Sequence, residues 1–133
     1  MKKMKFSLIG VLLLTLLIGV SSCQSDETIY DRVVGRTWVG DLNFQDEYGE
    51  PLESAVYLGA DSYGEDKLAY FDDNRTVRTL RIDWYVDGQT VYIRYGTVAA
   101  PREIRGAYVS GGRLSGELYI GGRYIGSVTL RLG

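Results

Sequence analysis

From residue 28 onward the sequence alternates between apolar and polar residues with a period of two, and short turns containing Gly, Asp or Asn separate the alternating stretches. This period places every second side chain on one face of a β-strand, so each stretch predicts a strand with one buried face. Helical spacing occurs only in Thr28–Val34, where Ile29 and Val33 share a face. Thr28 or Asp26 is the expected cap of that single turn. The predicted strands are 38–44, 54–59, 67–71, 79–86, 91–95, 102–109, 114–120 and 124–132.

These strands, about eight in number, are joined by short turns, which leave no room for a crossover helix, so the predicted sheet is antiparallel and sequential strands pair. An open meander exposes two edges, and closure into a barrel removes both. Glycines inside predicted strands favour closure, because they usually mark a sharp bend or a close approach of two backbones: Gly40, Gly106, Gly116 and Gly126. The sequence therefore predicts an all-β, eight-stranded up-and-down barrel, with a two-sheet β-sandwich of the same strand order as the alternative.

The best-defined pair of strands, 80–86 and 91–95, flanks the turn sequence Asp87-Gly88. Asp-Gly tolerates positive φ and suits a two-residue type I′ turn, which fixes the register. The expected inward-facing pairs are Trp84 with Val91, Ile82 with Ile93 and Leu80 with Tyr95. Two aromatic residues of strand 38–44 complete the candidate interior, which is also the candidate ligand lining: Trp38, Phe44, Leu80, Ile82, Trp84, Val91, Ile93 and Tyr95.

The outer face of this hairpin carries a mixed aromatic and charged set, here called the outer patch: Arg81, Asp83, Tyr85, Tyr92 and Arg94. Rings with a polar handle suit sugar faces and protein interfaces, which makes the patch a candidate binding surface. Cross-strand pairing on an exposed sheet face explains the same pattern without a ligand. The expected register sets Arg81 opposite Arg94, a like-charge pair that needs a counter-charge from Asp83 or another strand.

Two later turns leave the register open. A two-residue Gly111-Gly112 turn sets Val109 opposite Leu114, whereas a three-residue loop from Ser110 sets Tyr108 there instead. The Gly121-Gly122 turn is ambiguous in the same way.

The chain begins with features of an export signal. Three lysines precede the apolar run 6–20, whose 15 residues suit a secretory signal and are short for a membrane span. The sequence Val20-Ser21-Ser22-Cys23 resembles the bacterial lipobox, in which the cysteine becomes the lipidated first residue. An ordinary signal peptide with a chance cysteine is the alternative. The predicted organisation is a signal peptide 1–22, a lipidated Cys23 with tether 23–28, and a barrel 29–133.

The predicted mature chain is acidic. Removing residues 1–22 takes away three lysines, leaving 12 basic against 17 acidic residues and a net charge of −5. Such a domain repels nucleic acid and anionic lipid head groups, so acyl chains such as palmitate are the expected membrane attachment. Residues 24–27, Gln-Ser-Asp-Glu, resemble the acidic tag of surface-exposed lipoproteins of the Bacteroidetes type, although a plain solvated tether explains them equally well. The expected location is the outer membrane, with possible exposure at the cell surface.

The composition excludes much familiar chemistry. With no histidine and one cysteine, the chain has no Ser-His or Cys-His pair, no zinc site with histidine and no internal disulfide. Six oxygen-bearing residues lie close in sequence but lack the spacing of a calcium loop, and solvated loops explain them better: Asp61, Glu65, Asp66, Asp72, Asp73 and Asn74. No carboxylate pair is marked out for glycosidase work, so the sequence predicts a non-enzyme without cofactor or metal.

A short helical turn, Gly35 three residues before Trp38 and an eight-strand meander resemble the lipocalin-like group of small bacterial lipoproteins. Lipocalins open with Gly-x-Trp, whose tryptophan packs across the closed end of the barrel, whereas this chain has one more residue between the two. The resemblance implies the fold and no particular ligand. Because the domain is shorter than a full lipocalin, any cavity should be small or filled by Trp84, Phe44 and Tyr95.

Three classes of function remain. The favoured one is a surface-anchored module that binds a small apolar molecule or a glycan fragment, which should show a cavity with apolar walls and a few polar groups. The second is a binder of a protein partner, similar to the barrel-shaped lipoproteins that inhibit lysozymes, for which the charge of −5 would attract a basic enzyme. Those inhibitors usually carry a disulfide that this chain lacks. A structural or accessory lipoprotein is the third.

Overall fold

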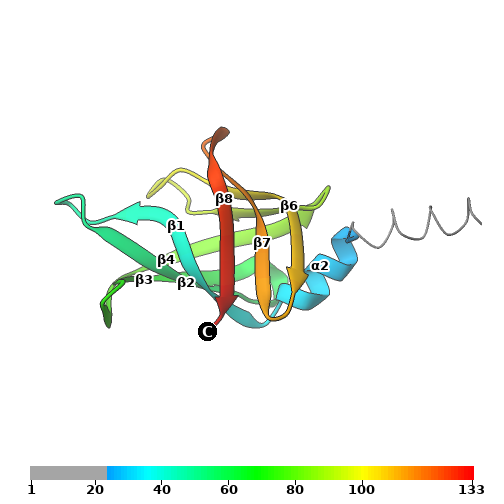
Figure 1. The fold of residues 1–133 in the computed structure, drawn as a ribbon, viewed down its shortest axis with the longest axis horizontal. Helices are drawn as coiled ribbons and strands as arrows, with labels where there is room; N and C mark the ends of the chain where they lie inside the picture. The colour runs from blue at the N-terminus through cyan, green and yellow to red at the C-terminus, as the bar shows by residue number, and fades with distance from the viewer. Residues whose placement is uncertain (1–23) are drawn as a thin grey trace, which may run out of the picture.

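The computed structural model describes residues 24–133, which form one closed antiparallel barrel with a short helix at its start (Figure 1). The predicted signal peptide and Cys23 lie outside the described residues. The elements are α2 (Asp26–Val33), β1 (Arg36–Gln45), β2 (Pro51–Leu58), the 3-10 turn η1 (Ala60–Ser62), β3 (Tyr63–Tyr70), β4 (Asp73–Asp87), β5 (Thr90–Arg94), β6 (Arg102–Ser110), β7 (Arg113–Ile120) and β8 (Arg123–Leu132).

The predicted up-and-down barrel is confirmed, and the sandwich alternative is wrong. Each strand pairs with its neighbours in sequence, and β8 returns to β1 through the pairs Trp38–Leu132 and Val39–Arg131. Gly40 of β1 follows this closure directly. A Cβ atom built there would lie 2.5 Å from Leu130 Cδ2, so the close approach of the first and last strands requires glycine.

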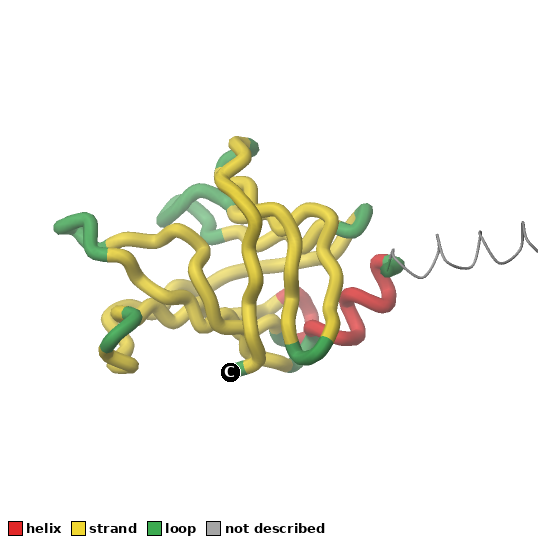
Figure 2. The backbone as a smooth tube through the Cα atoms, viewed as in Figure 1, coloured by secondary structure: helices red, strands yellow, loops and turns green. Residues whose placement is uncertain are grey.

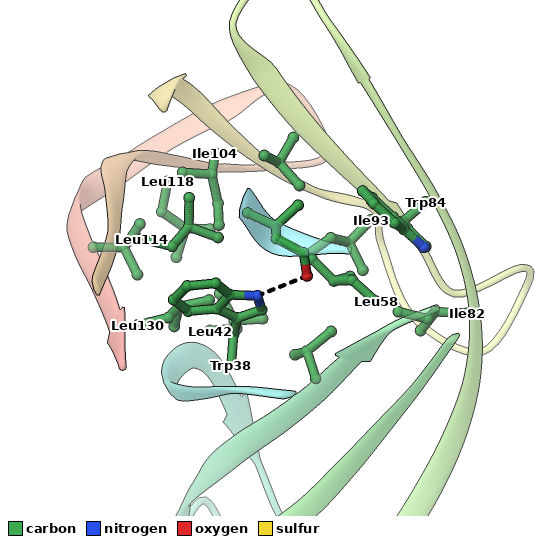
Figure 3. Close-up of a cluster of buried hydrophobic side chains, with 14 of the residues drawn as sticks. Trp38, Leu42, Leu58, Ile82, Trp84, Ile93, Ile104, Leu114, Leu118 and Leu130 are labelled. Carbon is green, nitrogen blue, oxygen red and sulfur yellow. Dashed lines mark hydrogen bonds between the residues drawn. The ribbon is translucent and has the colours of Figure 1, made fainter. Parts of the chain in front are cut away.

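The candidate interior is confirmed as the core. All eight predicted side chains are buried, at 8% exposure or less, and Figure 3 shows several of them packed against leucines from the opposite strands. The Trp38 indole donates a hydrogen bond of 3.1 Å to the Val33 carbonyl at the end of α2. Trp84 stacks on Tyr30 of the same helix, with ring centroids 5.3 Å apart. Both tryptophans therefore fasten α2 across one end of the barrel.

The helix starts earlier than the sequence predicts. Ser25, and not Thr28 or Asp26, is the cap, because its Oγ accepts the Thr28 N–H at 3.2 Å. Ile29 and Val33 share the buried face as expected, each with no exposed surface. The side-chain amide of Gln24 exchanges two hydrogen bonds of 2.9 and 2.8 Å with the backbone of Val109. Residues 24–28 are thus tied to the barrel, although the expected boundary between tether and domain was residue 29.

The predicted register of the β4–β5 hairpin is wrong by two residues. Trp84 pairs with Ile93 and not with Val91, so the turn consists of Gly88 and Gln89. Both have positive φ, +57° and +63°, as a type I′ turn requires. A shift of two residues keeps every side chain on its predicted face, so the predicted core survives the error.

The other hairpins resolve the open choices. Val109 pairs with Leu114 and Ile120 with Arg123, so Gly111-Gly112 and Gly121-Gly122 are both two-residue turns. The strands β2, β3 and β4 are longer than predicted, with β3 beginning at Tyr63 and not at Lys67. This extension brings Asp66 into a strand.

The two ends of the barrel differ. The helix α2 covers the end that carries the β4–β5 and β6–β7 turns, and the β1–β2 and β3–β4 connections lie at the far end (Figures 1 and 2). The longest loop, residues 95–101 between β5 and β6, also belongs to the end without the helix. Among residues 24–133 no helix has the length and apolar character needed to cross a membrane.

Candidate functional site: a cleft at the open end of the barrel

The end of the barrel opposite α2 contains a cleft of about 460 Å³, here called the mouth cleft. This volume lies in the range of small-molecule sites, roughly 300–1,000 Å³. The floor consists of core side chains that turn toward the opening, each 8% exposed or less: Phe44, Leu52, Leu68 and Leu80. The β1–β2 loop, the β5–β6 loop and the part of β4 around Val77 and Arg78 form the walls. Below this floor the barrel is filled with buried apolar side chains, and at the mouth cleft this core reaches the surface.

The rim of the mouth cleft carries both exposed apolar side chains and charged ones, the latter being Asp46, Glu47 and Arg78. Val77 of β4 and Val98 of the β5–β6 loop line it with 47% and 55% of their surface exposed. Tyr48 projects from the β1–β2 loop with 87% exposure, and Phe71 lies in the adjacent β3–β4 turn. A concentration of exposed apolar side chains around a cleft is typical of a binding surface.

The β1–β2 loop is held in one shape by the Asp46 carboxylate. Its Oδ1 accepts the backbone N–H groups of Tyr48 and Glu50, each at 2.9 Å, and its Oδ2 accepts the Tyr70 hydroxyl at 2.7 Å. The hydrogen bond from Tyr70, followed by the backbone bond from Glu50, lowers the pKa of Asp46. The loop is therefore fixed by an ionised carboxylate at neutral pH.

A buried polar layer lies one step below the floor of the mouth cleft, formed by Ser54, Asp66, Tyr95 and Arg102. Asp66 has no exposed surface, and its Oδ2 accepts hydrogen bonds from Tyr95 at 2.8 Å and from Ser54 at 3.0 Å. Its Oδ1 has no partner among the described residues. Burial raises the pKa of Asp66, while these two hydroxyls and the charge of Arg102 oppose the rise.

Arg102 spans the interior from β6 to β1. Its Nε donates to the Leu42 carbonyl at 3.0 Å and its second terminal nitrogen to the Asn43 carbonyl at 3.2 Å. The guanidinium lies 3.7 Å from the centroid of the Phe44 ring, on the floor of the mouth cleft. These carbonyls belong to the part of β1 that has bent away from β8, so Arg102 replaces missing strand pairing.

The structure places the outer patch on the wall of the barrel, away from the mouth cleft. Tyr85 and Tyr92 stack with centroids 4.5 Å apart, and Arg94 lies over Tyr85. The predicted Arg81–Arg94 pair is wrong, because Arg94 pairs with Asp83 at 2.6 Å and Arg81 lies opposite Glu65. Tyr85 thus stacks on Tyr92 and Arg94 pairs with Asp83, so the members of the patch interact with one another across the strands. This favours the interpretation of the patch as cross-strand stabilisation.

The six acids and amides considered for calcium are dispersed. Asp66 is in the core, Asp73 pairs with Arg75 at 3.2 Å, and Glu65 accepts the Tyr63 hydroxyl. The prediction of solvated loops is therefore wrong for Asp66, which is buried, and Glu65, Asp73 and Asn74 also belong to strands and not to loops. Among residues 24–133 no three His, Cys, Asp or Glu side chains come together as a metal site would need.

Only part of the candidate lining was placed by the sequence. Of the eight predicted interior residues, Phe44 and Leu80 line the mouth cleft, and the other six lie in the core. Sequence reasoning missed Leu52, because its strand was predicted to begin only at Ser54. It also missed Leu68, which lies inside the predicted strand 67–71 but was not assigned to the interior, and the loop residue Val98.

A second, smaller hollow of about 230 Å³ follows the seam where β1 and β8 separate, and is here called the seam groove. It is lined by Asp41 and Asn43 on one side and by Ile125 and its neighbours on the other. Its lining comes from β1, β7 and β8 and shares no residue with the mouth cleft, which makes it a useful control.

Comparisons with protein-family models, with curated proteins and with solved structures find no match for this chain.

Proposed function

We propose that this protein is a non-catalytic binding module whose ligand, a small molecule with an apolar body, occupies the mouth cleft. The observation that carries the proposal is the apolar floor of Phe44, Leu52, Leu68 and Leu80 at the one end of the barrel that α2 does not cover. An apolar, largely preformed hollow with few polar groups is the usual form of such a site. A glycan fragment is the less favoured ligand, because the two tyrosines of the outer patch stack on each other and Arg94 lies over Tyr85, which leaves less ring surface for sugar packing.

The orientation of the barrel supports an envelope-anchored role. The described chain begins beside α2, at the end opposite the mouth cleft (Figure 1). In our proposal residues 1–22 are a signal peptide, and Cys23 carries the acyl chains that anchor the domain in the outer membrane. With the anchor at the α2 end, the mouth cleft faces away from the bilayer and is open to solutes. The acidic charge of −5 then keeps the domain off anionic head groups.

A catalytic role is not part of the proposal. The Asp46 carboxylate at the mouth cleft is held by three hydrogen-bond donors, and the Asp66 carboxyl lies below an apolar floor. Both acids are thus committed to the structure of the barrel, which suits a container.

Titration with N-phenyl-1-naphthylamine, an uncharged probe that fluoresces in apolar sites, tests the proposal. Val98→Glu places a charge on the exposed rim and should weaken probe binding, since a carboxylate beside an apolar ligand must be desolvated. Ile125→Glu makes the same change in the seam groove and should leave binding intact. Equal binding by the two variants, or loss only in Ile125→Glu, would refute the mouth cleft as the site.

One observation favours a second function, the binding of a basic protein partner. Tyr48 stands almost fully exposed between Glu47 and Glu50 on a loop that Asp46 fixes in shape. A rigid aromatic tip with acidic flanks suits insertion into a basic cleft, as in an enzyme inhibitor. Inhibition of a lysozyme by the wild-type protein, lost in Tyr48→Ala and kept in Tyr108→Ala, which removes another exposed tyrosine, supports this function. Absence of inhibition by the wild-type protein rejects it for that enzyme.

A further inference from the structure

One arginine lies on the inward face of the barrel at the mouth cleft. In β4 the even-numbered residues Leu80, Ile82 and Trp84 point into the core, and Arg78 continues this series at the opening. Arg78 pairs with Leu68 of β3, whose side chain forms part of the floor, and both line the cleft. A guanidinium on the inward face, directly above an apolar floor, has no evident role in the packing of the barrel.

Within residues 24–133 the side chain of Arg78 has no hydrogen-bond or ion-pair partner. The ion pairs there use four other arginines: Arg75, Arg94, Arg105 and Arg131. Arg102 is bound to backbone carbonyls. The contrast with Arg75 is informative, because that residue lies on the same strand and is paired with Asp73. The guanidinium of Arg78 is therefore free to form a bidentate pair of hydrogen bonds with a carboxylate or a phosphate.

The acids of the mouth cleft stand on a different wall. Asp46 and Glu47 belong to the β1–β2 loop, whereas Arg78 projects from β4. Asp46 is occupied by Tyr70 and two backbone N–H groups, and Glu47 is exposed on the loop. On the β4 wall, Arg78 is the charged group that lines the cleft.

We infer that the ligand of the mouth cleft is an amphiphilic anion, whose apolar body lies on the floor and whose acidic head pairs with Arg78. This inference rests on the proposed function and adds the chemistry of the head group to it. Burial of the alkyl body supplies the non-directional part of the affinity, and the guanidinium selects the charge. The head group can be the carboxylate of a free fatty acid or the phosphate of a lipid, since both accept two parallel hydrogen bonds from a guanidinium.

Calorimetric titration of the purified, detergent-free protein with four ligands of one chain length tests the inference. The ligands are decanoate, decyl phosphate, the uncharged 1-decanol and the cationic decyltrimethylammonium, each below its micelle concentration. We expect decanoate or decyl phosphate to bind more tightly than 1-decanol, and the tighter of the two identifies the source of the head group. Arg78→Gln should weaken the anion about tenfold and leave 1-decanol unchanged. The control Arg75→Gln should change neither.

The two levels of the proposal fail differently. The inference is overturned if Arg78→Gln binds the anion as tightly as the wild type, or if the protein prefers the cation. In either case, binding of 1-decanol still supports the proposed function. Binding of none of the four ligands rejects the proposed function itself. Arg78 is exposed and unpaired in the described chain, so Arg78→Gln should fold, and an unchanged melting temperature verifies this.

Discussion

The Tyr95 hydroxyl donates a hydrogen bond of 2.8 Å to Oδ2 of Asp66, inside a barrel whose core is otherwise largely apolar. Tyr95 follows β5 and Asp66 belongs to β3, so the bond reaches across the intervening strand β4 below the mouth cleft. Tyr95 also packs edge-on against Phe44 of the floor, with centroids 5.1 Å apart. The polar layer and the floor of the cleft are therefore one packed unit.

The buried carboxyl of Asp66 should make stability fall as the pH rises. Burial raises its pKa in the folded protein, whereas in the unfolded chain an aspartate titrates near about 3.9. Between about pH 4 and the raised pKa the folded state holds a proton that the unfolded chain has lost, so the free energy of unfolding decreases with pH. Urea unfolding of wild type and Asp66→Asn across this interval should show the wild type losing stability relative to the variant. A difference that stays constant with pH would contradict the burial of an ionisable Asp66.

The Tyr95→Phe variant provides a second readout of the same group. The hydrogen bond from Tyr95 lowers the pKa of Asp66, so its removal should extend the loss of stability to higher pH. An unchanged pH profile in Tyr95→Phe would show that this bond does not form.

Asp26 should contribute more to stability than its neighbour Glu27. Its carboxylate accepts the backbone N–H groups of Gly88 at 3.0 Å and Gln89 at 2.8 Å, and so joins α2 to the β4–β5 turn. We expect Asp26→Ala to lower the free energy of unfolding by about 1–2 kcal/mol. Glu27→Ala removes a charge from the same helix turn without this contact, and serves as the control for the helix dipole. Equal losses in the two variants would assign the effect to the dipole alone.

Gly88 should tolerate no branched side chain. Its φ is +57° and nothing lies within 4 Å of an added Cβ, so the cost of substitution comes from the backbone alone. Gly88→Val should lower the free energy of unfolding by about 1 kcal/mol or more, with a lower melting temperature. Thr79→Val, on an exposed position of β4, should melt close to wild type. A wild-type melting temperature for Gly88→Val would remove the type I′ turn.

Cys23 should determine whether the protein is found in the membrane fraction. If this residue carries the acyl chains, Cys23→Ala should move the protein from the membrane fraction to the soluble fraction of the cell envelope. Immunoblots of fractionated cells measure this, with Ser22→Ala as a control that keeps the cysteine. Membrane retention of Cys23→Ala would rule out lipidation as the anchor.

The strand order and the two faces of each strand were predictable, because period-two alternation determines which side chains point inward whatever the register. Register was harder. The β4–β5 turn falls at Gly88-Gln89, where the Asp26 carboxylate, 62 residues away, binds both turn amides. A local rule that prefers Asp-Gly cannot anticipate such a contact, since it depends on how α2 packs on the barrel.

The candidate site was less predictable than the fold. Asp66 stands among acids that suggest a solvated loop, and only the extension of β3 to Tyr63 reveals that its side chain points inward. The alternation Asp66, Leu68, Tyr70 was a usable signal for this. The position of Arg78 at the mouth cleft depends on the length of β4 beyond the hairpin and on the bulge that follows its pairing with Leu68. Irregularities of this kind come from barrel closure, which no single strand encodes.

The central claim, a ligand seated in the mouth cleft, is tested most directly by mapping backbone amide chemical shifts in the presence of decanoate. The account predicts that the largest shifts cluster at Val98, Ala99 and the loop 46–50, with little change at Tyr85 and Tyr92. Shifts centred on Tyr85 and Tyr92, or on Ile125 in the seam groove, would contradict it.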